Sequence, residues 1–189
     1  MRFERFVADT VEDRRVEFYC VDSCPGLAQL SENVTFIERD VVSCLLAGTP
    51  LLEDTPGISF DVGVCFGFFH HVPGRQMRKA LLDALLDVVR PGGVVSVAFW
   101  RFMTLEKLAK KAELTTRKAL KELNVTLEAG DYLVGWQSRE GVYRYCHHFD
   151  EEEIDELSEY ASNRSVIIDR YQDDGRSGDL NTYLILERK

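Results

Sequence analysis

Residues 60–100 read FDVGVCFGFFHHVPGRQMRKALLDALLDVVRPGGVVSVAFW, and this stretch decides the fold. Phe60–Phe66 is apolar apart from one aspartate, which is typical of a parallel strand covered on both faces. Arg75–Arg90 repeats apolar side chains on one helical face, and Pro91-Gly92-Gly93 is expected to end this helix. Val94–Trp100 is the next predicted strand. A strand, a helix and a second strand in this order predict a right-handed crossover between parallel strands.

The residues before this stretch repeat the alternation. Arg2–Asp13 places its apolar side chains at helical spacing, and Arg15–Val21 and Val34–Arg39 are predicted strands. Leu45–Gly57 contains two glycines and two prolines and is predicted to be a loop. Together these elements predict an α/β fold with a parallel, doubly wound sheet.

The residues after position 100 add a basic helix, a hairpin, an acidic helix with Asp150 as its N-cap, and two closing strands. Their expected bounds are Leu105–Leu123 for the basic helix, Tyr132–Trp136 and Val142–Phe149 for the hairpin, Glu151–Tyr160 for the acidic helix, and Ser165–Tyr171 and Leu180–Glu187 for the strands. We expect residues 1–189 to form one domain, with the basic helix and hairpin inserted at about 102–149.

The charge is unevenly distributed. The whole chain has a net charge of −9, so as a whole it repels a polyanion. Arg101–Lys121, however, contains seven lysines and arginines against two glutamates. This segment is either a phosphate-binding surface or a solvated amphipathic helix. The sequence has neither an apolar run long enough to span a bilayer nor a signal-peptide core, and we expect a cytoplasmic protein.

The cysteines and histidines do not predict a metal centre. The five cysteines include no C-x-x-C pair, so neither a disulfide framework nor a zinc knuckle is expected. A site built from His70, His71, His147 and His148 lacks a supporting acid or thiolate spacing. We therefore expect no metal.

Ligands of open parallel sheets bind beyond the carboxyl ends of the strands. Asp22, followed by Ser23, ends one predicted strand and suits the two hydroxyls of a ribose, while Asp40 follows the next strand and suits an exocyclic adenine amine. Each aspartate alone is equally well explained as a helix cap or turn residue. The small and aromatic residues 66–74 after the third strand can line a slot for a purine and a sulfonium.

Three segments, VEFYCVDSCPGL at 16–27, VTFIERDV at 34–41 and the stretch 60–100, resemble the successive motifs of class I S-adenosylmethionine-dependent methyltransferases. The resemblance covers essentially the whole chain. It implies a Rossmann-like, mostly parallel sheet with an antiparallel C-terminal strand, and S-adenosylmethionine as the cofactor. It also implies cofactor-binding residues, which are Asp22, Ser23, Asp40, Val41, Phe66, Gly67 and His71.

The second half, with AGDYLVGWQ at 129–137, GVYRYCHHFDEEEIDEL at 141–157 and LNTYLILERK at 180–189, resembles tRNA wobble-uridine methyltransferases and their bacterial relatives. In that family a tryptophan is followed by an aromatic-Arg-Tyr-x-His run and an acidic helix. The residues that match this pattern by position are Trp136, Arg144, Tyr145 and His147 or His148. Cys146 and Gly135 depart from it. The acceptor therefore stays open, and tRNA binding through Arg101–Lys121 is one possibility.

The hairpin also suggests chemistry from its residues alone. Tyr143, Arg144, Tyr145 and His147 can stack a flat base or hold a carboxylate, although such alternation also describes an ordinary sheet face. The predicted catalytic residues are His70, Arg144, Tyr145 and His147, and the predicted substrate-binding residues are Phe69, Trp136 and Tyr143.

Domains of this family open with a strand and a glycine-rich turn, and Arg2–Asp13 resembles the helix that follows that turn. We therefore expect a truncated or misassigned start, with the first strand missing and cofactor binding weakened. Three functions remain open: methyl transfer to a tRNA uridine, methyl transfer to a small molecule, and a non-catalytic scaffold or partner subunit.

Overall fold

The structure is a computed structural model that describes residues 2–11, 16–27, 33–52, 57, 59–136 and 139–189. The chain divides into two compact units, Met1–Asp54 and Thr55–Lys189, and each is described by itself. None of the described helices combines the length and the apolar character that crossing a membrane requires. The expectation of a single domain stays a prediction.

The first unit pairs two short parallel strands. Helix α1 (Arg2–Thr10) precedes β1 (Phe18–Asp22), which pairs with β2 (Val34–Glu38) so that Asp22 lies opposite Glu38. A short helix, α2 (Val41–Ala47), follows β2. The predicted helix and both predicted strands are confirmed in their described parts, and Asp13 and Arg15 lie outside the described residues.

The second unit is built on a four-stranded sheet with the order β3-β4-β8-β7. Its strands are β3 (Phe60–Cys65), β4 (Val89–Trp100), β7 (Ser165–Asp173) and β8 (Asn181–Arg188). Strand β4 is parallel to β3, and β8 is antiparallel to both of its neighbours. It follows that β3, β4 and β7 run in one direction, which confirms the expected mostly parallel sheet with an antiparallel C-terminal strand.

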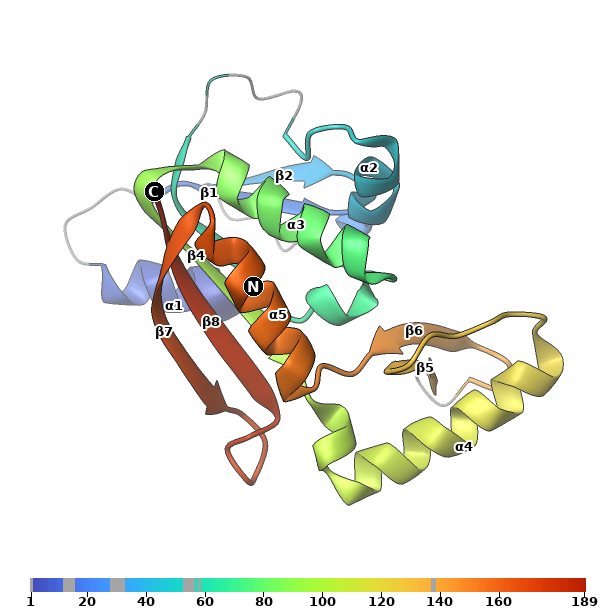
Figure 1. Ribbon diagram of the computed structural model, residues 1–189. Helices are drawn as coiled ribbons and strands as arrows, with labels where there is room; N and C mark the ends of the chain where they lie inside the picture. Colours follow the sequence, from blue (N-terminus) through green and yellow to red (C-terminus); the bar gives the residue numbers. More distant parts are fainter. Residues whose placement is uncertain (1, 12–15, 28–32, 53–56, 58, 137–138) are drawn as a thin grey trace. The chain divides into compact units, whose positions relative to one another are not determined.

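Two helices, α3 (Arg75–Val88) and α5 (Glu151–Ser162), lie on one face of this sheet (Figure 1). Helix α5 begins as predicted, because the Asp150 carboxylate accepts a hydrogen bond from the backbone N–H of Glu153 at 2.8 Å. The core between helices and sheet consists of large apolar side chains with almost no exposed surface, among them Phe69, Phe99, Phe149, Leu81, Leu82, Leu86, Ile154, Leu157, Leu184 and Leu186.

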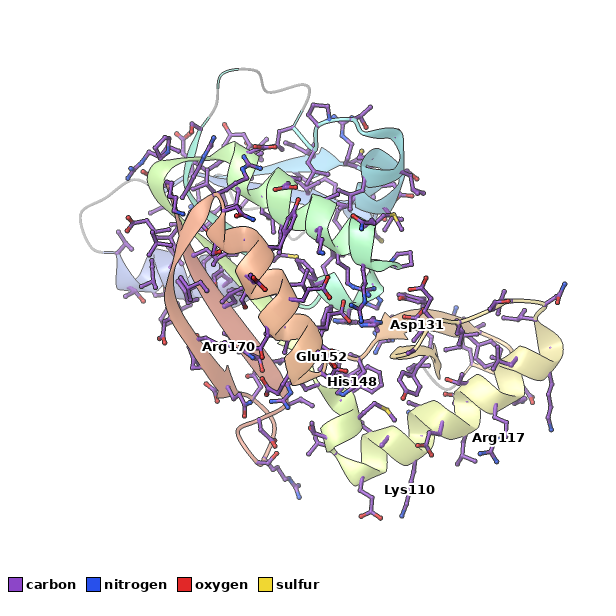
Figure 2. All side chains as sticks on the ribbon, in the orientation of Figure 1. Lys110, Arg117, Asp131, His148, Glu152 and Arg170 are labelled. Atoms are coloured by element: carbon purple, nitrogen blue, oxygen red, sulfur yellow. The ribbon has the colours of Figure 1, made fainter. Side chains whose placement is uncertain are left out.

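The predicted insert is present as a helix packed on a hairpin. The 3-10 turn η3 (Phe102–Thr104) leads into α4 (Glu106–Glu122), and β5 (Asp131–Gly135) pairs antiparallel with β6 (Tyr143–His147). Its small core contains Phe102, Ala112, Val134 and Cys146. In Figure 2, Lys110 and Arg117 project from α4 on the side away from β5 and β6.

Two sequence predictions are wrong in detail. Pro91-Gly92-Gly93 does not end α3, because the helix stops at Val88 and these residues form an irregular part of β4. There β4 advances from Val89 to Val94 while β3 advances only from Phe60 to Val62. The predicted loop Leu45–Gly57 begins in a helix, since α2 runs to Ala47 and ends at Gly48, whose φ of +65° is left-handed.

Gly93 has no room for a side chain. A Cβ built on it would lie 2.5 Å from Val89 Cγ1 and 2.9 Å from the backbone oxygen of Asp61. We expect Gly93→Ala to lower the free energy of unfolding by about 1–3 kcal/mol, because the strand backbone must move. Urea titration followed by the fluorescence of Trp100 and Trp136 measures this change.

Gly135→Ala is the matched control in β5. Its Cβ would meet Thr115 Cγ2 at an ordinary 3.6 Å, so the expected change is within about 0.5 kcal/mol. Equal effects of the two substitutions would contradict the steric explanation.

Candidate functional site

The carboxyl ends of β3 and β4 lie at one edge of the sheet, because the two strands are adjacent and parallel. After β3 come Phe66, which is 41% exposed, and Gly67, whose φ of +73° is left-handed. The 3-10 turn η2 (Phe69–His71) then supplies two histidines, and β4 ends at Trp100. This edge is where ligands of parallel α/β sheets bind, so these residues form the candidate site.

His70 and His71 are both neutral at pH 7. Burial, with smaller contributions from His71 and Arg144, lowers the pKa of His70 to about 3. Burial also lowers the pKa of His71, although a hydrogen bond to the Tyr145 carbonyl opposes the shift. His71 Nδ1 lies 2.8 Å from that oxygen, so Nδ1 donates its hydrogen and Nε2 carries the lone pair. The two rings lie against each other, with centroids 4.1 Å apart.

The guanidinium of Arg144 lies close to two indoles. Its guanidinium carbon is 4.8 Å from the ring centroid of Trp136 and 5.7 Å from that of Trp100. The Nε atom is buried without a hydrogen-bond partner, and no carboxylate of the described residues forms an ion pair with this side chain. Trp136 is 40% exposed, so this guanidinium, which has no counter-ion in the part of the chain that the structure describes, lies beside a surface side chain.

A series of hydrogen-bonded, mostly charged side chains, here called the buried network, joins Arg78, Glu153, His147, Asp131 and Tyr145. Arg78 Nε donates to Glu153 Oε1 at 2.7 Å, and Glu153 Oε2 lies 2.7 Å from His147 Nε2. On its other side, His147 Nδ1 lies 2.7 Å from Asp131 Oδ1, which also accepts from the Tyr145 hydroxyl at 2.5 Å. The network thereby connects α3, α5, β6 and β5.

The network favours charged side chains although they are buried. Burial disfavours the imidazolium of His147, but hydrogen bonds to Asp131 and Glu153 outweigh it and raise the pKa of His147. The same hydrogen bonds overcome burial at the two carboxylates and lower the pKa of Asp131 and of Glu153. His147 therefore donates from both nitrogens, and neither is free to take a proton from a ligand.

The structure separates the predicted residues of the second unit into different settings. Phe69 is completely buried, with its ring 5.1 Å from that of Phe99 and 5.9 Å from that of Phe149. The Tyr143 hydroxyl donates to Glu122 of α4 at 2.8 Å. His70, His71, Arg144 and Trp136 are brought together with Trp100, while Tyr145 and His147 belong to the buried network.

The predicted cofactor residues of the first unit lie at the carboxyl ends of β1 and β2. Asp22 Oδ1 accepts from Cys24 N–H at 2.8 Å, and Oδ2 receives no hydrogen bond from the described residues. Asp40 caps α2, with Oδ1 accepting from the Ser43 N–H and Oδ2 from the Ser43 hydroxyl, which lowers the pKa of Asp40. Ser23 is exposed and Val41 is buried as the first residue of α2.

Sequence reasoning did not include Trp100, Cys146, Asp131, Glu153 or Arg78 among the site residues. One signal was present: Arg78 lies on the same helical face as Leu81, Leu82 and Leu85, and a buried arginine requires a carboxylate partner. The partner itself, Glu153, is 75 residues away along the chain, and no local pattern identifies it.

Residues 4–95 match the family model described as "Methyltransferase domain". The sheet of the second unit, with the parallel pair beside an antiparallel last strand, agrees with this match. This match covers just under half of the chain, and together with the solved structures it shows the fold of class I S-adenosylmethionine-dependent methyltransferases.

Solved structures share the methyltransferase fold at low sequence identity. A SAM-dependent methyltransferase from Methanosarcina mazei is 16% identical with a TM-score of 0.59, and the match covers 97% of this chain and 96% of that one. The 1,6-didemethyltoxoflavin-N1-methyltransferase of Burkholderia thailandensis, solved with bound 1,6-didemethyltoxoflavin and S-adenosylhomocysteine, is 16% identical with a TM-score of 0.52, and the match covers 90% of this chain and 60% of that one.

N-methyltransferase NodS from Bradyrhizobium japonicum WM9, in complex with S-adenosyl-l-homocysteine, is 10% identical with a TM-score of 0.51, covering 91% of this chain and 66% of that one. No curated protein sequence matches this chain. The fold is thus shared, while the acceptor is not identified by these relatives.

The raised pKa of His147 predicts how the stability of the protein depends on pH. The stabilisation is fully present below the unfolded pKa of about 6.5 and is lost as the pH rises through the folded value. We expect His147→Asn to lower the free energy of unfolding by about 3–5 kcal/mol and to abolish this decline above pH 6.5. Urea unfolding at a series of pH values measures both effects.

His148→Asn is the control. Burial, only partly opposed by Asp150, lowers the pKa of His148 to about 4, so its effect on stability falls on the acidic side of pH 6.5. An alkaline decline that persists unchanged in His147→Asn would show that the buried network does not cause it.

Proposed function

We propose that the protein transfers a methyl group from S-adenosylmethionine to a small acceptor that carries an anionic group, held by Arg144. The observation that supports this proposal is the guanidinium close to Trp100 and Trp136, which lacks a counter-ion among the described residues. A guanidinium binds a carboxylate through two parallel hydrogen bonds, and the half-exposed Trp136 adds an aromatic surface beside it.

The neutral histidines suit an acceptor that needs little deprotonation. When bound, S-adenosylmethionine supplies an electrophilic methyl group on its sulfonium. Transfer to a nucleophile is an in-line displacement, in which positioning contributes most. His70, with a pKa of about 3, is a weak base, and both nitrogens of His147 are occupied. In this proposal Arg144 and the two tryptophans orient the acceptor, and His147 and Tyr145 hold the strand that presents Arg144.

The cofactor residues proposed here are those at the strand ends. Asp22 has a carboxylate oxygen available for a ribose hydroxyl. Both carboxylate oxygens of Asp40 already accept hydrogen bonds from Ser43, so we assign Asp40 to the border of the adenine site without a strong hydrogen bond to the adenine. Gly67 has open space where a side chain would lie, which suits the close approach of a ligand. The chemistry of these groups fits the cofactor.

Asp22→Ala tests the cofactor assignment. We expect the affinity for S-adenosylmethionine, measured by calorimetry, to fall at least tenfold, which corresponds to about 1.4 kcal/mol. Asp9→Ala on α1 is the control and should bind like the unchanged chain. Unchanged affinity in Asp22→Ala would contradict the assignment, and the absence of binding by the unchanged chain would favour a non-catalytic scaffold.

Arg144→Gln tests the acceptor class. Methyl transfer from labelled S-adenosylmethionine is first screened against small carboxylates, phosphates and their uncharged analogues. For an accepted anion we expect Arg144→Gln to raise KM about 10–100-fold, because one charged hydrogen-bonding group is lost. Arg139→Gln, which changes an exposed arginine between β5 and β6, should leave KM unchanged. A preference for uncharged acceptors, or an unchanged KM in Arg144→Gln, would contradict the proposal.

A tRNA uridine acceptor is the second candidate, and one observation favours it. Helix α4 exposes Lys107, Lys111, Arg117 and Lys121, none of which forms an ion pair with the described residues, whereas Lys110 and Lys118 pair with neighbouring glutamates. Binding of unmodified tRNA that weakens steeply with salt, and that is lost when these four residues are changed to glutamine, would favour tRNA over a small acceptor.

A further inference from the structure

Two histidines and a cysteine meet beside Arg144. The possible ligand atoms of His70, His71 and Cys146 all lie within 4.8 Å of one another. His70 and His71 come from η2, after β3, while Cys146 is the fourth residue of β6. The three residues therefore approach each other from two separate parts of the chain, which the sequence pattern does not reveal.

Each imidazole has a nitrogen that makes no hydrogen bond with the described residues. His70 is only 7% exposed, and its buried Nδ1 has no hydrogen-bond partner among the residues that the structure describes. A buried polar atom without a partner is rare in folded proteins and points to a missing ligand. His71 donates from Nδ1 to the Tyr145 carbonyl, and this arrangement orients many metal-binding histidines and leaves Nε2 to coordinate.

We propose that His70, His71 and Cys146 bind one zinc ion, with a fourth coordination position open to water. The proposal departs from the sequence-based expectation of no metal, and it goes beyond the proposed methyl transfer and does not depend on it. Imidazole nitrogen and thiolate sulfur are the ligands that zinc prefers, and three protein ligands with an open fourth position are typical of reactive zinc sites. Tetrahedral zinc places such atoms about 3.4–3.6 Å apart, so the side chains need to close by roughly 1 Å.

Zinc binding at this cluster requires the thiolate form of Cys146, because the other two ligands are neutral and Arg144 is positively charged. Both histidines are neutral at pH 7, so neither must lose a proton to bind a metal. Cys146 is completely buried, and burial raises the pKa of its thiol to about 11, although Arg144 opposes the shift. Zinc binding therefore releases one proton as the thiol becomes a zinc-bound thiolate. The Arg144 guanidinium repels a bare cation, and the new negative charge on sulfur offsets this repulsion.

The test is zinc binding by the whole metal-free chain, measured by calorimetry with ZnCl2 between pH 6 and 9. We expect one ion per chain and an affinity that rises about tenfold per pH unit, because one proton is released. Cobalt(II) in place of zinc should produce a sulfur-to-metal charge-transfer absorption. Cys146→Ser should abolish that absorption and weaken zinc binding at least 100-fold, and zinc should raise the Tm of the unchanged chain but not of this variant.

Cys65→Ser is the matched control. Cys65 is also buried, and burial raises the pKa of its thiol to about 12, but it lies outside the cluster. It should bind zinc and cobalt as the unchanged chain does. If Cys146→Ser does not fold, His71→Gln takes its place and should weaken zinc binding at least tenfold. No binding by the unchanged chain, a pH-independent affinity, or equal binding by all variants would overturn the proposal.

Discussion

The buried network is the interaction on which the rest of the second unit depends. Four charged side chains from α3, α5, β5 and β6 meet there with almost no access to water. Removing one of them leaves a buried charge without a partner, which costs more than the pair contributes when intact. The network also fixes where the insert attaches, because Asp131 and His147 belong to the hairpin and Arg78 and Glu153 to the helices on the sheet (Figure 1).

Strand β6 carries two kinds of chemistry because neighbouring side chains point to opposite faces. Tyr145 and His147 point into the buried network, while Arg144 and Cys146 point to the other face, beside Trp100 and the two histidines of η2. On one face of β6, hydrogen bonds of Tyr145 and His147 fix the position of the strand. The opposite face carries the guanidinium of Arg144 and the thiol of Cys146. Positioning residues therefore alternate with residues proposed to bind ligands along the four residues Arg144–His147.

Local patterns predicted the elements, and contacts between distant residues decided the site. The helices α3, α4 and α5 and the hairpin follow from periodicity and from the cap at Asp150, because each signal lies within one turn or one strand. Pro91-Gly92-Gly93 was misread because the same residues that end helices also permit a strand to bulge. Phe69 was predicted to bind substrate, yet it packs in the core, since an aromatic residue after a strand suits either place.

The two proposed ligands of the second unit carry opposite charges and bind next to each other. Arg144 attracts an anion, and its charge contributes to the lowered pKa of both His70 and His71. An anion held by Arg144 reduces the positive potential at the histidine–cysteine cluster, so it favours a metal ion there. Thermodynamic linkage then requires that the metal ion strengthen anion binding by the same factor. Within the described residues, the arginine lacks a counter-ion and His70 lacks a hydrogen-bond partner at Nδ1, and the two proposed ligands would satisfy both groups together.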